Sequence, residues 1–416
     1  MKYSGIEWIG DIPAHWNVVR TKTLFRNHKD VVGDEADNYE RLALTLNGVI
    51  KRSKEDNTGL QPEAFNGYQI LREGELVFKL IDLENVSTSR VGLSPYTGIV
   101  SPAYIILKPQ GDIHAPYAQY YYLSMWQREI FNHIGDDGVR SSLNAKDLLN
   151  VPIIVPTIKE QEAIANYLDS VCSTINQSIN QTRETITQYK KLKQAIISHT
   201  VVSGIRGERG MRPSGIEWIG NIPQDWDILR GKVVLRILER PVEDNDGVIT
   251  CFRDGEVTLR SNRREEGFTL SLQEAGYQGI EPGDLVVHGM DGFAGAIGIS
   301  DSRGKGTPVL NVMDSTQNKR YIMYYLRRMA YDGVFLALST GIRVRSCDTN
   351  WNKIKNLPFL IPSIEEQQEI ADYLDEKCAE IDRLISMKEE FLVELEKYKK
   401  TLVYDYVTGK KEVPTA

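Results

Sequence analysis

The residue types that carry enzymatic chemistry are present in this sequence, but they are not spaced for it. The glycine-rich segment from Gly298 to Gly306 resembles a phosphate-binding loop, yet five residues rather than four separate Gly298 from Gly304. Gly306 also stands where such a loop has its Mg²⁺-binding serine or threonine. The six histidines form no H-E-x-x-H motif and the four cysteines form no C-x-x-C pair. The sequence therefore predicts a chain that binds or assembles rather than one that catalyses.

Basic side chains that could bind a polyanion gather in polar segments. Arginine presents a planar fork of donors that matches a phosphate group or the O6 and N7 atoms of guanine. For any single residue a solvated surface is the simpler interpretation, whereas the clusters taken together favour DNA binding. The candidate DNA-binding residues, all in segments expected to be loops, are Lys51, Arg52, Lys54, Ser87, Ser89, Arg90, Arg140, Arg253, Arg260, Arg263, Arg264, Arg343 and Arg345.

The formal net charge of −7, taken alone, argues against a nucleic-acid partner. The acidic excess is local, because residues 357–416 carry 14 acidic and 8 basic side chains whereas residues 211–356 carry 19 of each. No apolar run approaches the roughly 20 residues that span a bilayer, and the first residues lack a signal-peptide pattern. These features predict a cytoplasmic protein whose own affinity for DNA is weak.

A domain duplication organises the sequence. The segment S-G-I-E-W-I-G-D-I-P-A-H-W from Ser4 returns as S-G-I-E-W-I-G-N-I-P-Q-D-W from Ser214, with ten of thirteen positions identical at an offset of 210. P-T-I-K-E-Q from Pro156 returns as P-S-I-E-E-Q from Pro362, and the I-A-x-Y-L-D that follows is repeated as well, at an offset of 206. The 416 residues are therefore two copies of a unit of about 208 residues, which is far longer than a solenoid repeat.

Each copy is expected to contain a mixed α/β region followed by one long helix. In the α/β regions short β-prone runs alternate with turn residues, and helices are expected at about 116–133 and 318–331. Residues 158–200 and 364–406 contain no proline or glycine and repeat apolar side chains every three or four positions. These two helices would each span about 65 Å. Antiparallel pairing as a coiled coil would bury both stripes, and two separate surface helices are the alternative.

The paired motifs S-G-I-E-W-I-G-x-I-P-x-x-W and P-x-I-x-E-Q-x-x-I-A-x-Y-L-D resemble those of specificity subunits of type I restriction-modification systems, over essentially the whole chain. The resemblance implies an α+β protein in which two mixed α/β target recognition domains are separated by two long antiparallel helices forming a coiled coil, with an internal pseudo-twofold duplication. It implies recognition domains at residues 1–155 and 206–357, a central spacer helix at 156–205, and a second spacer helix with a tail at 358–416. Each recognition domain would read one half of a bipartite, asymmetric site in double-stranded DNA.

The resemblance also implies partner proteins. The helices would dock two DNA methyltransferase subunits that modify adenine N6, and restriction and translocase subunits would join the complex. The chain itself would be non-catalytic and would hold no cofactor or metal, because S-adenosylmethionine, ATP and Mg²⁺ would belong to the partners. A non-catalytic coiled-coil scaffold for protein interactions is the alternative function.

Two features separate the copies. The alignment is lost after the equivalent Cys172 and Cys378, where the distance to the next shared tyrosine grows from 17 to 20 residues, so the pseudo-twofold symmetry is imperfect. The globular regions differ greatly between their shared motifs, which predicts that the two half-sites differ in sequence. The best equivalent pair of loop arginines is Arg140 and Arg343, each preceded by a glycine and an aliphatic residue.

Overall fold

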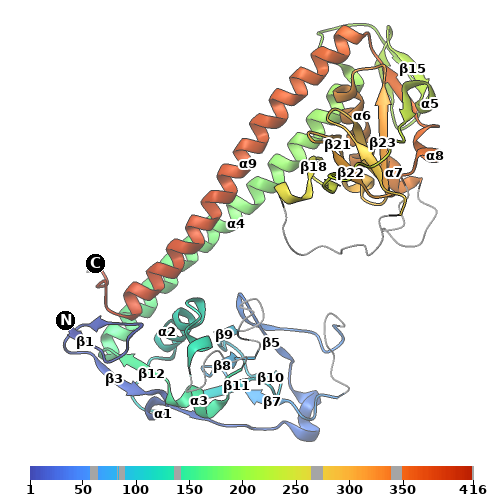
Figure 1. Cartoon of the computed structure of the whole chain (residues 1–416). Helices are drawn as coiled ribbons and strands as arrows, with labels where there is room; N and C mark the ends of the chain where they lie inside the picture. The colour runs from blue at the N-terminus through green and yellow to red at the C-terminus, as the bar shows by residue number, and fades with distance from the viewer. Residues whose placement is uncertain are drawn as a thin grey trace. The chain divides into compact units, whose positions relative to one another are not determined.

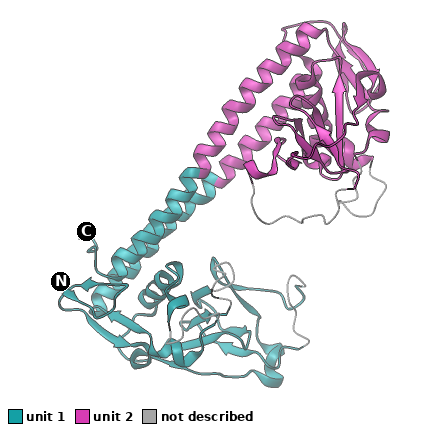
Figure 2. Cartoon of the chain, in the orientation of Figure 1, with its two compact units in different colours: residues 1–182, 390–416 teal, residues 183–389 magenta. Residues whose placement is uncertain are grey.

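The computed structural model describes two compact units of this chain. It describes residues 1–56, 64–81, 83, 90–134, 142–263, 275–338 and 349–414, with the elements labelled in Figure 1. Unit 1 comprises residues 1–182 and 390–416, and unit 2 comprises residues 183–389 (Figure 2). Each unit therefore combines one globular region with the start of one long helix and the end of the other.

A four-stranded antiparallel sheet forms the centre of unit 1. Its strand order is β4 (Phe25–Asn27), β11 (Ile105–Pro109), β8 (Leu76–Lys79) and β9 (Arg90–Leu93). Since successive side chains of a strand point to opposite faces, Leu76 and Phe78 pack with Tyr122 of helix α2 (Ala115–Gln127), whereas Val77 packs into a second cluster on the other face. The sheet is therefore buried on both faces.

Unit 2 repeats this arrangement. Its sheet has the order β16 (Leu235–Ile237), β23 (Leu310–Ser315), β20 (Leu285–His288) and β21 (Ile297–Ile299). Leu285 and Val287 pack with Tyr325 of helix α6 (Lys319–Tyr331), while Val286 packs on the opposite face. The same strand order and the same alternation of buried side chains mean that both copies of the duplicated sequence adopt one fold.

A β-hairpin packs against one edge of each central sheet. The hairpins are β5 (Leu42–Thr45) with β6 (Gly48–Lys51), and β17 (Ile249–Cys251) with β18 (Val257–Leu259). Each turn uses a glycine at positive φ, Gly48 at 94° and Gly255 at 92°. Each hairpin also approaches a glycine of the edge strand: a Cβ atom on Gly92 would lie 2.7 Å from Leu44 Cδ1, and one on Gly298 would meet the Gly255 carbonyl oxygen. The missing side chains let the hairpins sit directly on the sheets.

The remaining strands form two-stranded pairs that recur in both units. The pairs of unit 1 are β1 (Lys2–Tyr3) with β2 (Asp11–Ile12), β3 (Asn17–Arg20) with β12 (Pro152–Val155), and β7 (Gln69–Leu71) with β10 (Gly98–Val100). Their counterparts are β13 (Met211–Pro213) with β14 (Asn221–Pro223), β15 (Asp227–Arg230) with β24 (Pro358–Ile361), and β19 (Gln278–Ile280) with β22 (Gly304–Gly306). β12 and β24 lead directly into the long helices.

Short helical segments connect these strands. The α-helical ones are α1 (Thr21–Leu24), α3 (Ala145–Asn150), α5 (Gly231–Val234), α7 (Val334–Ala337) and α8 (Trp351–Ile354). The 3₁₀ turns are η1 (Gly33–Asn38), η2 (Ile130–His133), η3 (Arg260–Asn262) and η4 (Gly292–Ala294). Asn144 and Asn350 cap α3 and α8: the Asn144 side chain accepts from the Lys146 and Asp147 N–H groups, and the Asn350 side chain accepts from the Lys353 N–H group.

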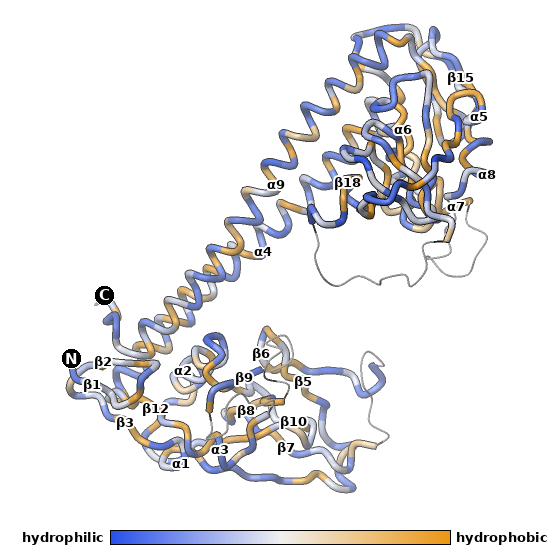
Figure 3. The backbone as a smooth tube through the Cα atoms, viewed as in Figure 1, coloured by the Kyte–Doolittle hydropathy of each residue, from blue (hydrophilic) through white to orange (hydrophobic). Residues whose placement is uncertain are grey.

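The two long helices pair within each unit. Helix α4 runs from Ile158 to Ser203 and helix α9 from Ile364 to Val407, and apolar residues recur along both (Figure 3). The pairs that join them are Tyr167 with Tyr406 (3.3 Å) and Asn176 with Lys399 (2.7 Å) in unit 1, and Lys190 with Glu389 (3.7 Å) and Lys193 with Asp382 (2.6 Å) in unit 2. In each unit the partner's number falls as the number on α4 rises, so the helices are antiparallel.

The fold class predicted from the sequence is confirmed: mixed α/β regions alternate with long helices that pair antiparallel. One predicted boundary is wrong. The helix expected at 116–133 ends at Gln127, because Glu129 adopts the left-handed conformation at φ 58° and the 3₁₀ turn η2 follows. In the described residues, no helix is both long and apolar enough to cross a membrane.

Candidate nucleic-acid interface

The β5–β6 hairpin and the residues after it carry three of the predicted DNA-binding side chains of unit 1. Lys51 lies within strand β6 rather than in the predicted loop, and its Nζ is 2.6 Å from a Glu40 carboxylate oxygen. Arg52 follows directly, and its Nε donates to Asp56 at 2.7 Å. Lys54 donates to a backbone carbonyl of η1 at 2.7 Å. These three cations therefore lie at the end of strand β6 and in the residues that follow it.

Arg52 and Arg90 lie apart in the sequence, and the charges of both act on Tyr104. Burial raises the pKa of the Tyr104 hydroxyl, and the guanidinium charges of Arg90, Arg41 and Arg52 oppose that increase. Arg90 is the first residue of strand β9, not a loop residue, and burial lowers its pKa. Arg41 is 6% exposed and holds its guanidinium 5.5 Å from the Phe65 ring centre. We call these five residues the basic–aromatic cluster of unit 1; its partly exposed members are available to a polyanion, whereas the buried Arg41 supports them from below.

Arg41 is a member of this cluster that the sequence analysis missed. It is an isolated basic residue just before strand β5, with no second cation beside it in the sequence. Clustering along the chain therefore cannot identify it. The only signal available was its place one residue before an alternating apolar strand, which positions it at the end of the hairpin opposite the turn.

In unit 2 the structure brings Arg253, Arg260 and Arg263 together on the β17–β18 hairpin. Arg253 lies in the turn between the strands, whereas Arg260 opens η3 directly after β18. Nε of Arg260 donates to the Thr250 hydroxyl at 3.2 Å, and the Arg263 guanidinium lies 4.1 Å from the ring centre of Phe252. The arginine-rich hairpin is the unit 2 counterpart of the basic segment after β6.

Acidic side chains accompany these arginines. Nη2 of Arg253 lies 2.7 Å from Asp291, and Nη1 of Arg263 lies 2.8 Å from Asp254 and 2.9 Å from Glu256. Carboxylates repel phosphates but can accept a hydrogen bond from cytosine N4 in the major groove. The hairpin of unit 2 therefore offers charge-balanced, directional contacts, as do Lys51 and Arg52 of unit 1 with their partners Glu40 and Asp56.

The structure makes Arg52 and Arg260 equivalent to each other. Each directly follows the second strand of its hairpin, and each backbone N–H donates to the residue before the first strand, Arg52 to Arg41 at 2.9 Å and Arg260 to Val248 at 2.8 Å. The sequence carries a matching signal, N-G-V-I-K-R-S in the first copy and D-G-E-V-T-L-R-S in the second. One additional residue after the turn of the second copy hides the alignment when the sequences are compared position by position.

The other predicted residues, Ser87, Ser89, Arg140, Arg264, Arg343 and Arg345, lie outside the described residues. The segments that contain Arg140 and Arg343 end at equivalent places. The Leu143 N–H donates to the Leu80 carbonyl at 2.9 Å, and the Thr349 N–H donates to the Gly289 carbonyl at 2.8 Å. The two acceptors are equivalent, because Leu80 directly follows β8 and Gly289 directly follows β20. That Arg140 and Arg343 are themselves equivalent stays a prediction.

The repeated motifs at the starts of the long helices hold each unit together. The indole N–H of Trp16 donates to Glu160 at 3.1 Å, and that of Trp226 donates to Glu366 at 3.1 Å. Glu160 also accepts from the Thr157 N–H at 2.9 Å and so closes the first turn of α4. One glutamate therefore connects the repeated opening motif, which ends in tryptophan, to the first turn of the helix.

The glutamine next to each glutamate has a second structural role. The backbone N–H of His114, which precedes α2, donates to the Gln161 side chain at 2.8 Å, and that of Asn318, which precedes α6, donates to Gln367 at 3.0 Å. The tyrosines of α2 and α6 reach the same helices through Tyr120 with Asp169 (2.6 Å) and Tyr324 with Asp375 (2.7 Å). The duplicated motifs thus build the frame of each unit and leave the hairpins as the candidate interface.

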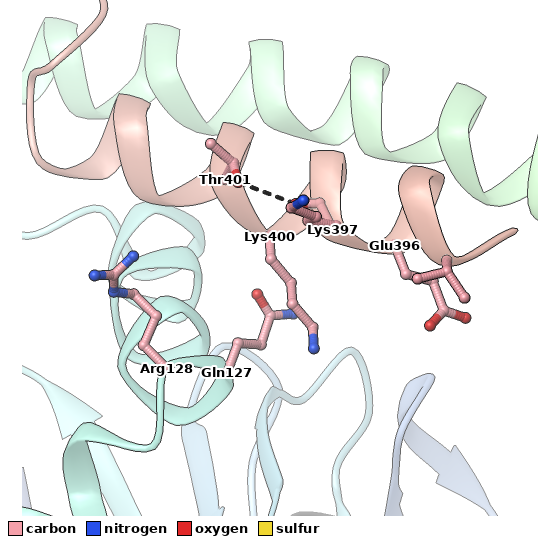
Figure 4. Close-up of a pocket in the computed structure, with 7 residues that line it drawn as sticks. Gln127, Arg128, Glu396, Lys397, Lys400 and Thr401 are labelled. Atoms are coloured by element: carbon pink, nitrogen blue, oxygen red, sulfur yellow. Dashed lines mark hydrogen bonds between the residues drawn. The ribbon is translucent and has the colours of Figure 1, made fainter. Parts of the chain in front are cut away.

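An open pocket of about 330 Å³ in unit 1 lies between the end of α2 and helix α9 (Figure 4). Gln127 and Arg128 come from the helix end, and the Arg128 guanidinium covers the Tyr404 ring at 4.0 Å from its centre. Lys397 and Lys400 of α9 line the other side with exposed side chains. Exposed lysines without buried polar partners do not define a ligand site.

The glycine-rich segment that resembles a phosphate loop forms strands. Gly298 lies in β21, and Gly304 to Gly306 is β22, which pairs with β19. Its glycines pack closely: a Cβ atom on Gly306 would lie 2.5 Å from Ile280 Cδ1. In the part of the chain that the structure describes, no three side chains gather that could hold a metal ion.

Comparison with known proteins shows what this chain is similar to. Residues 23–188 match the type I restriction modification DNA specificity domain. Over 98% of its length the chain is 22% identical to the putative type I restriction enzyme MjaX specificity subunit of Methanocaldococcus jannaschii, of which 96% is covered. Over 90% of its length it is 22% identical to the type I restriction enzyme StySPI specificity subunit of Salmonella potsdam, of which 84% is covered. Over its length the chain is therefore similar to specificity subunits of type I restriction-modification systems.

Solved structures share the fold. A chain from a structure of the type I R-M system, determined to explain complex assembly and conformational transition, superposes with a TM-score of 0.69 at 13% identity, covering 96% of this chain and 100% of that one. The HsdS subunit of Thermoanaerobacter tengcongensis superposes with a TM-score of 0.50 at 14% identity, covering 96% and 98% of the two chains. The duplicated architecture is therefore one that specificity subunits adopt.

Proposed function

We propose that this chain is the DNA-reading subunit of a type I restriction-modification complex, with each globular region recognising one half of a bipartite, asymmetric site. The observation that carries the proposal is the repeated hairpin: both units present basic side chains at the same structural position, in a chain whose residues 23–188 match the type I restriction modification DNA specificity domain. The surrounding side chains differ, which accounts for two different half-sites. The match to the specificity domain favours this role over that of a protein-interaction scaffold.

The domain assignment follows from this role. Residues 1–155 and 206–357 would be the recognition domains, and residues 156–205 and 358–416 would form the spacer helices and the tail. The hydrogen bonds of Trp16 and Trp226 to glutamates at the helix starts support a rigid junction between recognition domain and spacer, because both indoles are nearly buried. A rigid junction would hold each reading surface at a constant distance along the helix axis.

The helices would also dock two methyltransferase subunits. Support comes from large apolar side chains that the helix pairing leaves exposed: Phe391 and Tyr398 in unit 1 are 47% and 53% exposed, and Leu192 and Met387 in unit 2 are 48% and 60% exposed. Tyrosine, phenylalanine and methionine are enriched in the cores of protein–protein interfaces. The two units carry different ones, so the two docked subunits would make different contacts.

The chemistry would belong to the partners in the cytoplasm. Methyltransferase subunits would supply S-adenosylmethionine and adenine-N6 methylation, and restriction and translocase subunits would supply ATP- and Mg²⁺-dependent steps. The chain contributes binding and orientation and would be non-catalytic.

Selection from a library of random DNA duplexes tests the proposal. The full-length chain, alone and with its methyltransferase partner, is expected to enrich two unrelated short sequences separated by a gap of constant length. Because counterion release makes binding to phosphates salt-dependent, the selection is run at two salt concentrations. A bound pool without any enriched sequence at both concentrations would contradict the proposal.

A further inference from the structure

The two hairpins share one arginine although their other exposed side chains differ. Arg52 and Arg260 hold the same backbone position, but a lysine precedes the first and a leucine precedes the second. The residue that follows is the same in both copies, Ser53 and Ser261, and both serines are exposed. The two copies therefore repeat an arginine–serine pair at the place where each hairpin ends.

The hydrogen bond that each arginine donates through Nε differs between the units. Nε of Arg52 donates to Asp56 at 2.7 Å, whereas Nε of Arg260 donates to the Thr250 hydroxyl at 3.2 Å, so these two contacts are not duplicated. The tryptophan–glutamate pairs at the helix starts behave differently, because both of their members recur. A structural role would favour repetition of both members of a contact.

We propose that Arg52 and Arg260 bind DNA phosphates and thereby set the position of each recognition domain on the duplex. This inference rests on the proposed function. Two domains that read different half-sites cannot distinguish them with a residue that they share, whereas phosphate contacts are independent of sequence and serve both domains equally. The neighbouring Ser53 and Ser261 add hydroxyl groups, which are frequent phosphate donors. Arginine supplies a charged, bidentate donor for the same group.

The same comparison separates positioning residues from reading residues. Lys54 follows Arg52 by two residues, where the second copy has Asn262, and Arg263 follows Arg260 by three, where the first copy has Glu55. These side chains change character between the copies, so they are the ones suited to different bases. Each hairpin would thus provide one phosphate contact that both copies share and neighbouring side chains, different in each copy, that contact bases.

The duplication also provides matched controls. Arg26 in β4 and Arg236 in β16 are a second pair of equivalent arginines; both are exposed, Arg236 to 74%, whereas Arg52 and Arg260 are half-buried. Their strands form the edge of each central sheet opposite the edge that carries the hairpin. They test whether a shared, exposed arginine affects DNA binding regardless of its place.

The experiment measures affinity of the full-length chain for two duplexes, one with the selected site and one with both half-sites scrambled, across a series of salt concentrations. Arg52→Ala and Arg260→Ala are each expected to weaken binding to both duplexes about tenfold at fixed salt. Each is also expected to reduce the slope of log affinity against log salt by about one, because one fewer phosphate is neutralised.

Arg52→Lys and Arg260→Lys should keep the slope, since lysine also neutralises a phosphate. Arg26→Ala and Arg236→Ala should change neither quantity.

Three results would overturn the inference. They are an unchanged slope in both alanine variants, a loss of preference confined to one base position, or an equal effect of the control variants. Thermal unfolding of every variant identifies any that fails to fold, in which case the lysine variants decide. If the library selection enriches no sequence, the proposed function fails; if it enriches a bipartite site and the slopes do not change, only the phosphate assignment fails.

Discussion

The helix starts and the hairpins express the same duplication in opposite ways. At the helix starts both members of each contact recur, as in Trp16 with Glu160 and Trp226 with Glu366. In the hairpins the backbone recurs, including the turn glycine and the close approach to the sheet, but most exposed side chains differ. The comparison teaches that a duplicated recognition protein keeps its frame by repeating contacts and diversifies its specificity where side chains face solvent.

The two hairpins pair their cations with carboxylates in a similar way. Lys51 and Arg52 of unit 1 lie beside Glu40 and Asp56, and Arg253 and Arg263 of unit 2 lie beside Asp291 and Asp254. Both units should therefore combine salt-dependent attraction to phosphates with directional hydrogen bonds.

Breaking the frame should have the largest effect. Trp226 is 1% exposed, and Trp226→Ala would remove a large buried ring together with its hydrogen bond to Glu366, at a cost of about 3–5 kcal/mol in the free energy of unfolding. Trp16→Ala should have a similar effect on unit 1. Denaturant unfolding monitors both, and Trp226→Phe separates the ring from the N–H group. An unchanged unfolding midpoint in both alanine variants would show that the repeated contact is not part of the frame.

Adding a methyl group where each hairpin packs on its sheet should have an intermediate effect on stability, and the effect should differ between the two units. A Cβ atom on Gly298 would meet the backbone carbonyl of Gly255, which cannot move alone, whereas one on Gly92 would meet the end of the Leu44 side chain. Gly298→Ala is therefore expected to cost about 1–3 kcal/mol and to weaken one half-site, and Gly92→Ala is expected to cost less. Unfolding and binding curves compare the two. Equal losses of stability in the two variants would mean that the two glycines are packed equally tightly against their hairpins.

Removing variable side chains should change one half-site at a time. Lys54→Ala and Arg263→Ala are expected to relax the preference at one position in different half-sites, by about 1–3 kcal/mol for a base contact. Selection with each variant gives the altered preference directly. If either variant relaxes the base preference in both half-sites, the unit that contains it does not read only one half-site.

The smallest expected effect concerns pH. Burial opposes ionisation of Glu160, but hydrogen bonds from Thr157, His15 and Trp16 outweigh it and lower its pKa to about 2. Because this value is below the ordinary 4.5, ionised Glu160 stabilises unit 1 above pH 4.5, and this stabilisation is lost as the pH falls toward 2. Glu160→Gln should flatten the dependence of unfolding free energy on pH in that window, and the exposed Glu162→Gln should not. A steep dependence that survives Glu160→Gln would assign it to other carboxylates.

The sequence alone predicts the frame well. Repeated motifs reveal the duplication, and three- and four-residue apolar spacing predicts helices at 158–200 and 364–406, which the structure extends by only a few residues to Ser203 and Val407. These patterns are local and periodic, so they can be recognised in the sequence without knowledge of tertiary contacts.

The contacts within the frame and the interface are harder to predict. Glu160 and Trp16 are separated by 144 residues, so nothing in the local sequence indicates that they meet. Arg41 has no basic neighbour in the sequence, and the equivalence of Arg52 and Arg260 is hidden by one additional residue after the second turn. Lys51 and Arg90 were expected in loops but lie in strands, because polar side chains are tolerated where a strand faces solvent.

The central claim is that each unit reads one half-site and that the paired helices act as the spacer between the half-sites, and lengthening those helices tests it most directly. Four residues are inserted into each helix at a paired level of unit 1, after Asn176 in α4 and before Lys399 in α9, which adds about 6 Å to both helices. Selection with this variant is expected to return the same two half-sites with the gap lengthened by about one or two base pairs, given 3.4 Å per base pair. An insertion in α4 alone serves as the control, because it breaks the pairing without extending it. An unchanged gap with intact binding, or altered half-sites, would contradict the account.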